Sequence, residues 1–83
     1  SAVALADPGK VYIIYLPDGG KVSVDLSEAK GALTARWFNP RDGRWREPFK
    51  LQGGRRADFV GPDQHDWTLL VRLADTQRDH ERE

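Results

Sequence analysis

Residues 32–45, ALTARWFNPRDGRW, decide the fold that the rest of the chain adopts. Alternating apolar residues run into a turn at 39–43 and then resume, which predicts two β-strands joined by a tight hairpin. Pro40 fixes the backbone angle that suits the second turn position, and Asn39 can accept a hydrogen bond from its own turn. Gly43 can take the left-handed conformation that closes such a loop. We therefore expect an aromatic and basic β-hairpin at the centre of the chain.

The remaining predicted strands are short apolar or alternating segments that are bounded by turn residues. They are 3–6, Val11–Leu16, 21–26, 57–60 and Trp67–Leu73, and the hairpin adds 32–39 and 44–49. Val11–Leu16 has no polar face, which predicts a central strand that is covered on both faces. Segment 27–31 is the one helix-like stretch and allows a single turn. Segment 51–56 is expected to be a loop or a second hairpin.

Seven short strands with turn chemistry between them predict an all-β fold, a small antiparallel β-sandwich of immunoglobulin-like size. A small barrel is the alternative. The side chains expected in its core are apolar ones on one face of the alternating strands: Val22, Val24, Leu26, Leu33, Ala35, Trp37, Trp67, Leu69 and Val71.

The length of 83 residues indicates one domain, which we place at 1–75, followed by a charged tail at 76–83 that is expected to be disordered. The chain has no cysteine, so its stability must come from packing and not from disulfides or a cysteine-bound zinc ion. It has no methionine either, which indicates a piece of a longer protein. Its longest apolar run, Val11–Leu16, is far too short to span a membrane, and we expect no membrane partner.

The net charge is zero, but the charges are unevenly distributed along the chain. Residues 36–56 carry seven basic and two acidic side chains, whereas residues 57–83 carry three basic and seven acidic ones. We expect the basic middle to lie beside the acidic last third in the folded domain.

The residue types give little indication of a catalytic site or a metal site. A serine triad would have to combine Ser1, Ser23 or Ser27 with His65, and no nucleophile motif accompanies them. The loop 63–66, Asp-Gln-His-Asp, has side chains that can bind metal, but turn and capping roles explain them equally well. We therefore predict a domain without enzymatic activity, metal or cofactor.

Arginine and aromatic side chains alternate through the middle of the chain, as they do on some surfaces that bind single-stranded nucleic acid. The members of this set are Arg36, Trp37, Phe38, Arg41, Arg44, Trp45, Arg46, Arg55 and Arg56. The neutral balance argues against nucleic acid as a partner. The same side chains can stack on sugars or hold a polyproline-II ligand, and the alternative without a ligand is a buried tryptophan with solvated arginines around it.

Four segments of the chain resemble a known family, the so-called putative collagen-binding domain, and the resemblance runs from about residue 4 to residue 73. The segments are VYIIYLP at 11–17 with its glycine turn, Val24-Asp25-Leu26, WFNPRDG at 37–43, and Phe59 through Pro62 to DWTL at 66–69. Gly61-Pro62 stands where the family pattern has Pro-Pro, a departure that concerns the shape of one loop.

This resemblance implies a non-catalytic β-sandwich, C-terminal to a glycoside-hydrolase-like (β/α)₈ barrel in a bacterial protein that is secreted or in the cell envelope. It leaves three functions open: binding of collagen or another matrix polymer, binding of carbohydrate, and a structural cap that packs on the barrel. For a binding function we expect the contacts at Arg41, Arg44 and Trp45, because the two arginines lie at the turn and Pro48 predicts an edge strand that would expose the indole.

Overall fold

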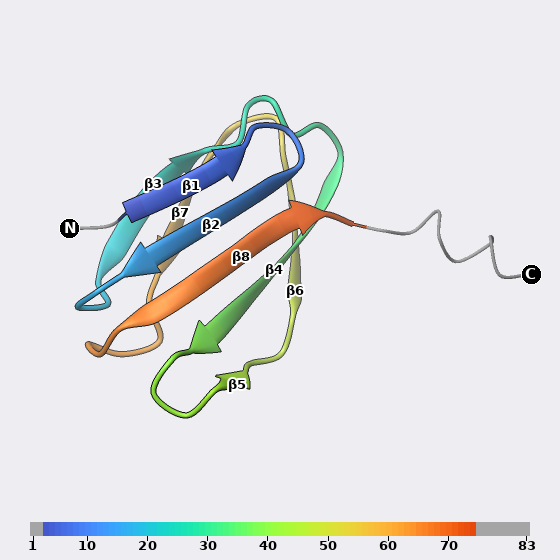
Figure 1. The fold of residues 1–83 in the computed structure, drawn as a ribbon. Helices are drawn as coiled ribbons and strands as arrows, with labels where there is room; N and C mark the ends of the chain where they lie inside the picture. Colours follow the sequence, from blue (N-terminus) through green and yellow to red (C-terminus); the bar gives the residue numbers. More distant parts are fainter. Residues whose placement is uncertain (1–2, 75–83) are drawn as a thin grey trace, which may run out of the picture.

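The computed structural model describes residues 3–74 and contains eight strands (Figure 1). The strands are β1 Val3–Asp7, β2 Val11–Leu16, β3 Lys21–Asp25, β4 Ala32–Asn39, β5 Arg44–Trp45, β6 Phe49–Gln52, β7 Arg56–Val60 and β8 Trp67–Leu73. Every pairing between them is antiparallel, and no helix occurs in the described range. The predicted all-β class is confirmed.

The strands form two sheets of very different size. The larger sheet has the order β1-β2-β8-β4-β5, with β6 also paired to β4, and the smaller sheet consists of β3 and β7. Figure 1 shows the small sheet behind β1 and β2, so it covers one face of the large sheet. The opposite face of the large sheet, which we call the outer face, has no second layer within the described residues.

The register of the large sheet brings distant parts of the chain together. Ile14 of β2 lies opposite Leu69 of β8, and Leu69 lies opposite Trp37 of β4. Because antiparallel partners share a face, these three side chains all point into the core. The last strand is therefore the centre of the sheet, and the predicted hairpin strand β4 packs directly beside it.

The core lies between the two sheets and is made of apolar side chains that alternate along each strand. Its fully buried members include Ile14, Leu16, Leu26, Leu33, Leu69 and Val71, and Trp37 and Trp67 are also buried. Of the predicted core, Val22 is only half-buried, and Leu73, which shares the inward face of β8, is 40% exposed. Leu73 is the last residue of β8.

The central position of β2 is confirmed, because it pairs with β1 on one edge and β8 on the other. The expectation that both its faces are covered is wrong. Tyr12, Ile14 and Leu16 are buried, whereas Ile13 and Tyr15 are exposed on the outer face. An apolar residue carries no signal that distinguishes a covered face from an uncovered one, and this explains the error.

The strand predicted at 44–49 is divided into β5 and β6 by a bulge, so the structure has eight strands and not seven. Trp45 pairs with Phe38 and Phe49 pairs with Ala35, which leaves three residues on one side opposite two on β4. Pro48 lies in the bulge, where its missing N–H removes no ladder bond. The strand β6 also occupies part of the segment predicted as a loop at 51–56.

The turn at 27–31 contains no helix, and its Ala29 is fully buried, with its backbone against Gly53. Within the described residues there is accordingly no helix long and apolar enough to cross a membrane. The predicted charged tail at 76–83 lies outside the described residues.

Candidate functional site

The turn of the central hairpin is held as its sequence predicts. The Asn39 side-chain oxygen accepts a hydrogen bond of 2.9 Å from the Arg41 N–H, and the Asn39 carbonyl accepts one of 2.8 Å from the Gly43 N–H. Gly43 has φ of 73°, the left-handed conformation that a side chain would strain. Asp42 accepts a bond from the Arg44 N–H, so each polar residue of the turn has a structural role.

Arg41 points from this turn to the loop that precedes β8. Its Nε donates to Asp66 Oδ1 at 2.8 Å, and its Nη2 donates to the Asp66 carbonyl at 2.9 Å. Its guanidinium also lies over the buried Trp67 ring, with Cζ 5.1 Å from the ring centroid. The planar fork of Arg41 thus joins two loops and covers the edge of the core.

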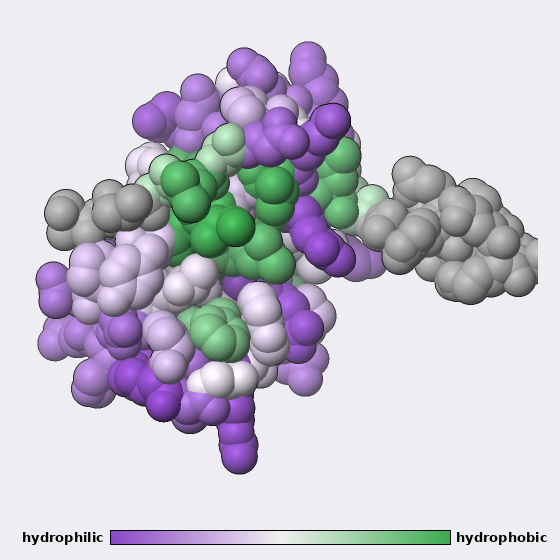
Figure 2. Space-filling model, viewed as in Figure 1, coloured by the Kyte–Doolittle hydropathy of each residue, from purple (hydrophilic) through white to green (hydrophobic). Residues whose placement is uncertain are grey.

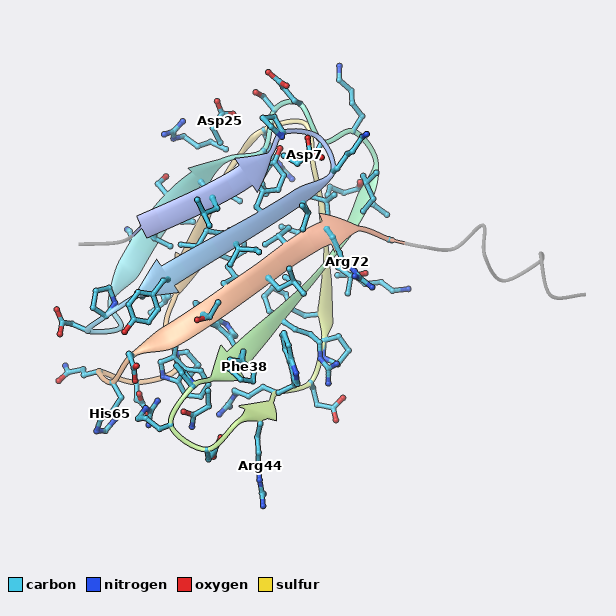
Figure 3. The ribbon with its side chains drawn as sticks, in the orientation of Figure 1. Asp7, Asp25, Phe38, Arg44, His65 and Arg72 are labelled. Carbon is cyan, nitrogen blue, oxygen red and sulfur yellow. The ribbon has the colours of Figure 1, made fainter. Side chains whose placement is uncertain are left out.

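Arg44 extends from β5 away from the sheets, as Figure 3 shows, and its backbone pairs with Asn39. Within the described residues its side chain makes no hydrogen bond or ion pair. Trp45, the next residue, points to the outer face because it lies opposite Phe38. The structure therefore places the three predicted contact residues in three directions and not in one cluster.

Trp45 is 44% exposed at the free edge of the large sheet. Its ring packs against Phe38 at a centroid distance of 4.8 Å, and the guanidinium Cζ of Arg36 lies 5.3 Å from its centroid. Arg36 is itself anchored, since its Nε donates to the Arg46 carbonyl in the bulge at 3.0 Å. Phe38 and Arg36 hold the indole in a fixed position, which lowers the entropy that a contact with a ligand would cost.

Beside Trp45 the outer face is hollowed into a groove of about 460 Å³, which we call the Trp45 groove. Its lining consists of Thr34, Arg36, Trp45, Pro48, Leu70 and Arg72. The floor is formed by outward residues of β4 and β8, and the wall by the bulge that separates β5 from β6. Trp45 also borders a second hollow of about 500 Å³, whose lining consists of Trp37, Trp45, Arg46, Glu47 and Phe49.

The side chains that line the Trp45 groove are mainly hydrogen-bond donors. Two guanidinium groups and an indole N–H can donate, whereas no carboxylate or carboxamide side chain lines the groove. Thr34 supplies the only side-chain hydroxyl among the residues that line the groove. A ligand rich in acceptors and poor in donors matches such a surface best.

The outer face also carries a group of exposed apolar residues beside the groove. Figure 2 shows apolar residues gathered over β1, β2 and β8, where Leu5 is 69% exposed and Ile13 is 41% exposed. Leu5, Ile13 and Leu70 lie side by side in the register of these three strands. We call this set the apolar patch, and it adjoins the groove through Leu70.

The acidic loop 63–66 has structural partners for its side chains. Asp63 Oδ1 accepts hydrogen bonds from Trp67 Nε1 at 2.7 Å and from the His65 N–H at 2.9 Å. These hydrogen bonds lower the pKa of Asp63 to about 2, and the bond from Trp67 has the largest effect. Asp66 binds Arg41 and accepts a 3.2 Å bond from the Tyr15 hydroxyl, whose pKa is raised by desolvation first and then by Asp66. Among residues 3–74 no cluster of three histidine or acidic side chains is placed to hold a metal.

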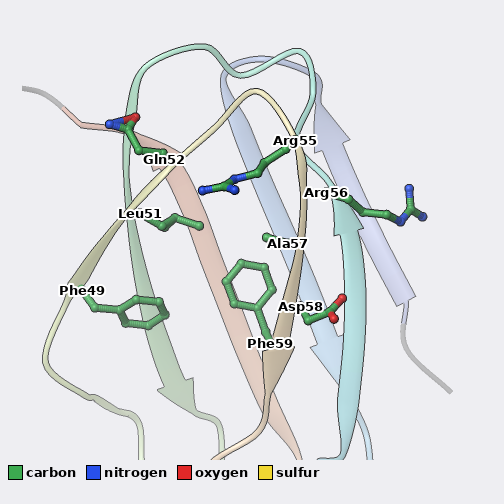
Figure 4. Close-up of a pocket in the computed structure, with 8 residues that line it drawn as sticks. All are labelled: Phe49, Leu51, Gln52, Arg55, Arg56, Ala57, Asp58 and Phe59. Atoms are coloured by element: carbon green, nitrogen blue, oxygen red, sulfur yellow. The ribbon is translucent and has the colours of Figure 1, made fainter.

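A further cleft of about 360 Å³ opens between β6 and β7, on the side where the two sheets separate (Figure 4). Phe49, Leu51, Ala57 and Phe59 form its apolar lining, and Arg55 extends into it from above. This cleft is where the small sheet fails to cover the large one, and it contains no grouping of catalytic side chains.

Sequence reasoning identified Trp45 and, in the wider basic set, Arg36, but it did not identify Arg72 or Thr34. The signal available was the alternation of β8, in which Thr68, Leu70 and Arg72 occupy the face opposite the core. It could not be used without knowing that β8 lies beside β4, a pairing between residues that are 30 to 40 positions apart in the sequence.

Comparisons with known proteins agree with this architecture. Residues 2–72 match the model of the family described as "Putative collagen-binding domain of a collagenase". A solved structure named "Glycoside hydrolase" superposes with a TM-score of 0.75 over 88% of this chain, at 22% sequence identity, and the match covers 17% of that chain. At this identity the likeness shows a shared fold, and the present chain corresponds to a small part of that protein. No protein with a curated description matches the sequence.

Proposed function

Because this chain belongs to the family of putative collagen-binding domains, we propose that it is a non-catalytic accessory module that binds collagen or a similar matrix polymer. The observation that carries the proposal is the composition of the Trp45 groove. The exposed indole of Trp45 lies beside the guanidinium donors of Arg36 and Arg72, and no acidic or amide side chain lines the groove. A collagen chain is its chemical complement. Polyproline-II strands display flat proline rings and carbonyl oxygens, and proline lacks an N–H.

Neutral polysaccharide is the weaker alternative for the same groove. Sugar hydroxyls donate as well as accept, so sites that hold them usually supply both kinds of partner. Stacking on Trp45 would serve either ligand, but the groove offers a sugar few side-chain acceptors. We therefore place collagen-like polymers first and carbohydrate second.

In this proposal the three predicted contact residues have different tasks. Trp45 packs on the ligand, and Arg44 reaches outward at the end of the hairpin, where it can donate to a polymer that continues past the groove. Arg41 acts by holding the turn, because Asp66 already occupies two of its donor atoms.

The test is a titration of the purified chain with a triple-helical peptide of Gly-Pro-Pro repeats, followed by tryptophan fluorescence and calorimetry. Trp45→Ala should weaken binding by about 1–3 kcal/mol and leave the circular dichroism spectrum unchanged. Leu5→Ala, an exposed apolar residue of the same face outside the groove, serves as the matched control and should bind normally. Unfolding of the Trp45→Ala variant would show that the indole is structural, and unaltered binding would remove it from the site.

A second candidate function is a structural cap on a catalytic domain, and the apolar patch favours it. Leu5 and Ile13 expose a hydrophobic surface in the isolated domain that packing against a larger domain would bury. The partner we propose is an N-terminal (β/α)₈ barrel in the full-length protein, and the resemblance to part of a glycoside hydrolase supports it. The two functions are compatible, because patch and groove occupy adjoining parts of the outer face.

We further propose that the full-length protein is secreted or held in the cell envelope, since its collagen-like ligand would lie outside the cell. The module itself should not hydrolyse collagen peptides or polysaccharides. Hydrolysis by the purified chain, abolished by His65→Ala or Asp66→Ala, would contradict the non-catalytic role.

A further inference from the structure

The Trp45 groove lies in the most basic part of the outer face. In the register of the large sheet, Arg72 of β8 lies opposite Thr34 of β4, and Lys50 of β6 lies on the other side of Thr34. Arg36 lies two positions further along β4, on the same face. Three cations therefore surround one threonine at the floor of the groove.

The two arginines of this group are close enough to act on one anion. Arg36 pairs with Leu70 and Arg72 pairs with Thr34, so the two arginines are diagonal neighbours on adjacent strands. The residues of such a diagonal pair lie about 7–8 Å apart. Guanidinium groups at that spacing can reach a common carboxylate, since each has a flexible stem of three methylene groups.

Neither guanidinium is neutralised by the protein within residues 3–74. The ion pairs of this range involve Arg41 and His65, and none involves Arg36 or Arg72. Arg36 is oriented by its Nε bond to the Arg46 carbonyl and by the Trp45 ring, which leaves its two Nη groups for a ligand. The outward positions of β2, β4, β6 and β8 carry no aspartate or glutamate, and Asp7 of β1, which lies in the same row of the register as Arg72, is separated from it by Val11 of β2.

We propose that Arg36 and Arg72 form a carboxylate site, so that the groove selects collagen-like segments in which an aspartate or glutamate lies beside proline. This inference rests on the proposed function and adds to it a preference for sequence. The acidic side chain takes donors from both guanidiniums while the neighbouring proline ring packs on Trp45 and Pro48. Side chains at the second and third positions of collagen triplets point outward from the triple helix and are available for such contacts.

The experiment compares three triple-helical peptides of equal length: Gly-Pro-Pro repeats alone, the same repeats with two central glutamates, and the same repeats with two central lysines. The wild-type 83-residue chain should bind the glutamate peptide at least about tenfold more tightly than the neutral one, and the lysine peptide most weakly. The preference should shrink as salt is raised from 50 to 500 mM.

Substitutions then locate the preference. Arg36→Gln and Arg72→Gln should each weaken binding of the glutamate peptide far more than binding of the neutral peptide, so that the two affinities become similar. Arg56→Gln, an exposed arginine on the small sheet, removes the same charge elsewhere and should preserve the preference. Arg72→Gln is the easier variant to interpret, because the exposed Arg72 side chain makes no hydrogen bond in the described structure. Circular dichroism spectra that match the wild type verify that each variant is folded.

Each failure has a distinct meaning. Equal affinity for the neutral and acidic peptides would overturn the carboxylate site and leave the proposed function intact. Absence of binding to all three peptides would overturn both. Binding of polygalacturonate instead of any peptide, with loss in Arg72→Gln, would assign the site to acidic polysaccharide and refute the collagen-like ligand.

Discussion

Arg41 and Asp66 are joined by two hydrogen bonds, from Nε to Oδ1 at 2.8 Å and from Nη2 to the backbone carbonyl at 2.9 Å. The bonds connect the turn between β4 and β5 to the segment that enters β8. The other carboxylate oxygen of Asp66 accepts from the Tyr15 hydroxyl of β2. A single acidic residue thus fixes three segments at one end of the sandwich.

We expect Arg41→Ala to lower the free energy of unfolding by about 1–2 kcal/mol, because it removes charge-assisted hydrogen bonds and the contact with the Trp67 ring. Arg41→Lys keeps the charge but lacks the planar fork, and it should recover only a small part of the loss. Urea unfolding measures both. Arg44→Ala is the matched control and should lie within about 0.5 kcal/mol of wild type. Equal stability of all four proteins would show that the Arg41 contacts contribute nothing.

Asp63 makes the stability of the domain depend on pH in the acid range. Its folded pKa of about 2 lies below the ordinary value of 3.8, so its contribution is present above pH 3.8 and is lost as the pH falls through about 2. The unfolding midpoint in urea should therefore decrease between about pH 4 and pH 2. Asp63→Asn keeps an oxygen acceptor for Trp67 Nε1 but cannot titrate, and it should reduce this decrease.

The control for that measurement is Asp18→Asn, which changes an exposed aspartate whose side chain accepts no hydrogen bond in the described structure. Its pH profile should follow that of the wild type. Part of the decrease should survive in Asp63→Asn, since the pKa of Asp25 is also lowered, first by its hydrogen bond with Ser27. Superimposable profiles for Asp63→Asn and wild type would exclude Asp63 as the titrating group.

Gly53 is required because its backbone lies directly against that of Ala29. A Cβ at this position would overlap the Ala29 carbonyl, while the Gly53 N–H donates to the Gly31 carbonyl at 2.9 Å and prevents retreat. We expect Gly53→Ala to cost about 1–3 kcal/mol, as overpacked sites do. Thermal unfolding measures it against Gln52→Ala, an exposed neighbour that should change little. A Gly53→Ala protein as stable as this control would mean that the turn at 27–31 moves freely.

Local pattern was enough to predict most of the strands. Alternation located β3, β4 and β8 with the correct inward face, and Gly43 with Asn39 predicted the turn that the structure contains. The bulge between β5 and β6 was missed, because its position depends on the register against β4 and not on the residues of the bulge alone.

The groove could be predicted only in part. Trp45 was identified because Pro48 indicated an edge strand, and the edge position is confirmed by the single pairing of β5 with β4. Arg72 joins the groove through the pairing of β8 with β4, which the sequence of either strand does not specify. That Arg41 would bind Asp66 could not be foreseen either, since opposite charges far apart in a chain have many possible partners.

Ile13 and Ile14 are adjacent in β2 but lie on opposite faces of the large sheet, with exposed fractions of 41% and 0%. Ile14→Ala should lower the free energy of unfolding by about 2–5 kcal/mol, because it leaves a cavity beside Leu69. Ile13→Ala removes the same atoms from the apolar patch and should cost less than about 1 kcal/mol. The pair forms its own control, since chain length, strand and residue type are identical, and chemical denaturation at several protein concentrations measures both. Similar large losses at both positions would mean that the outer face is covered, and a loss for Ile13→Ala that grows with protein concentration would identify a second copy of the chain as the cover.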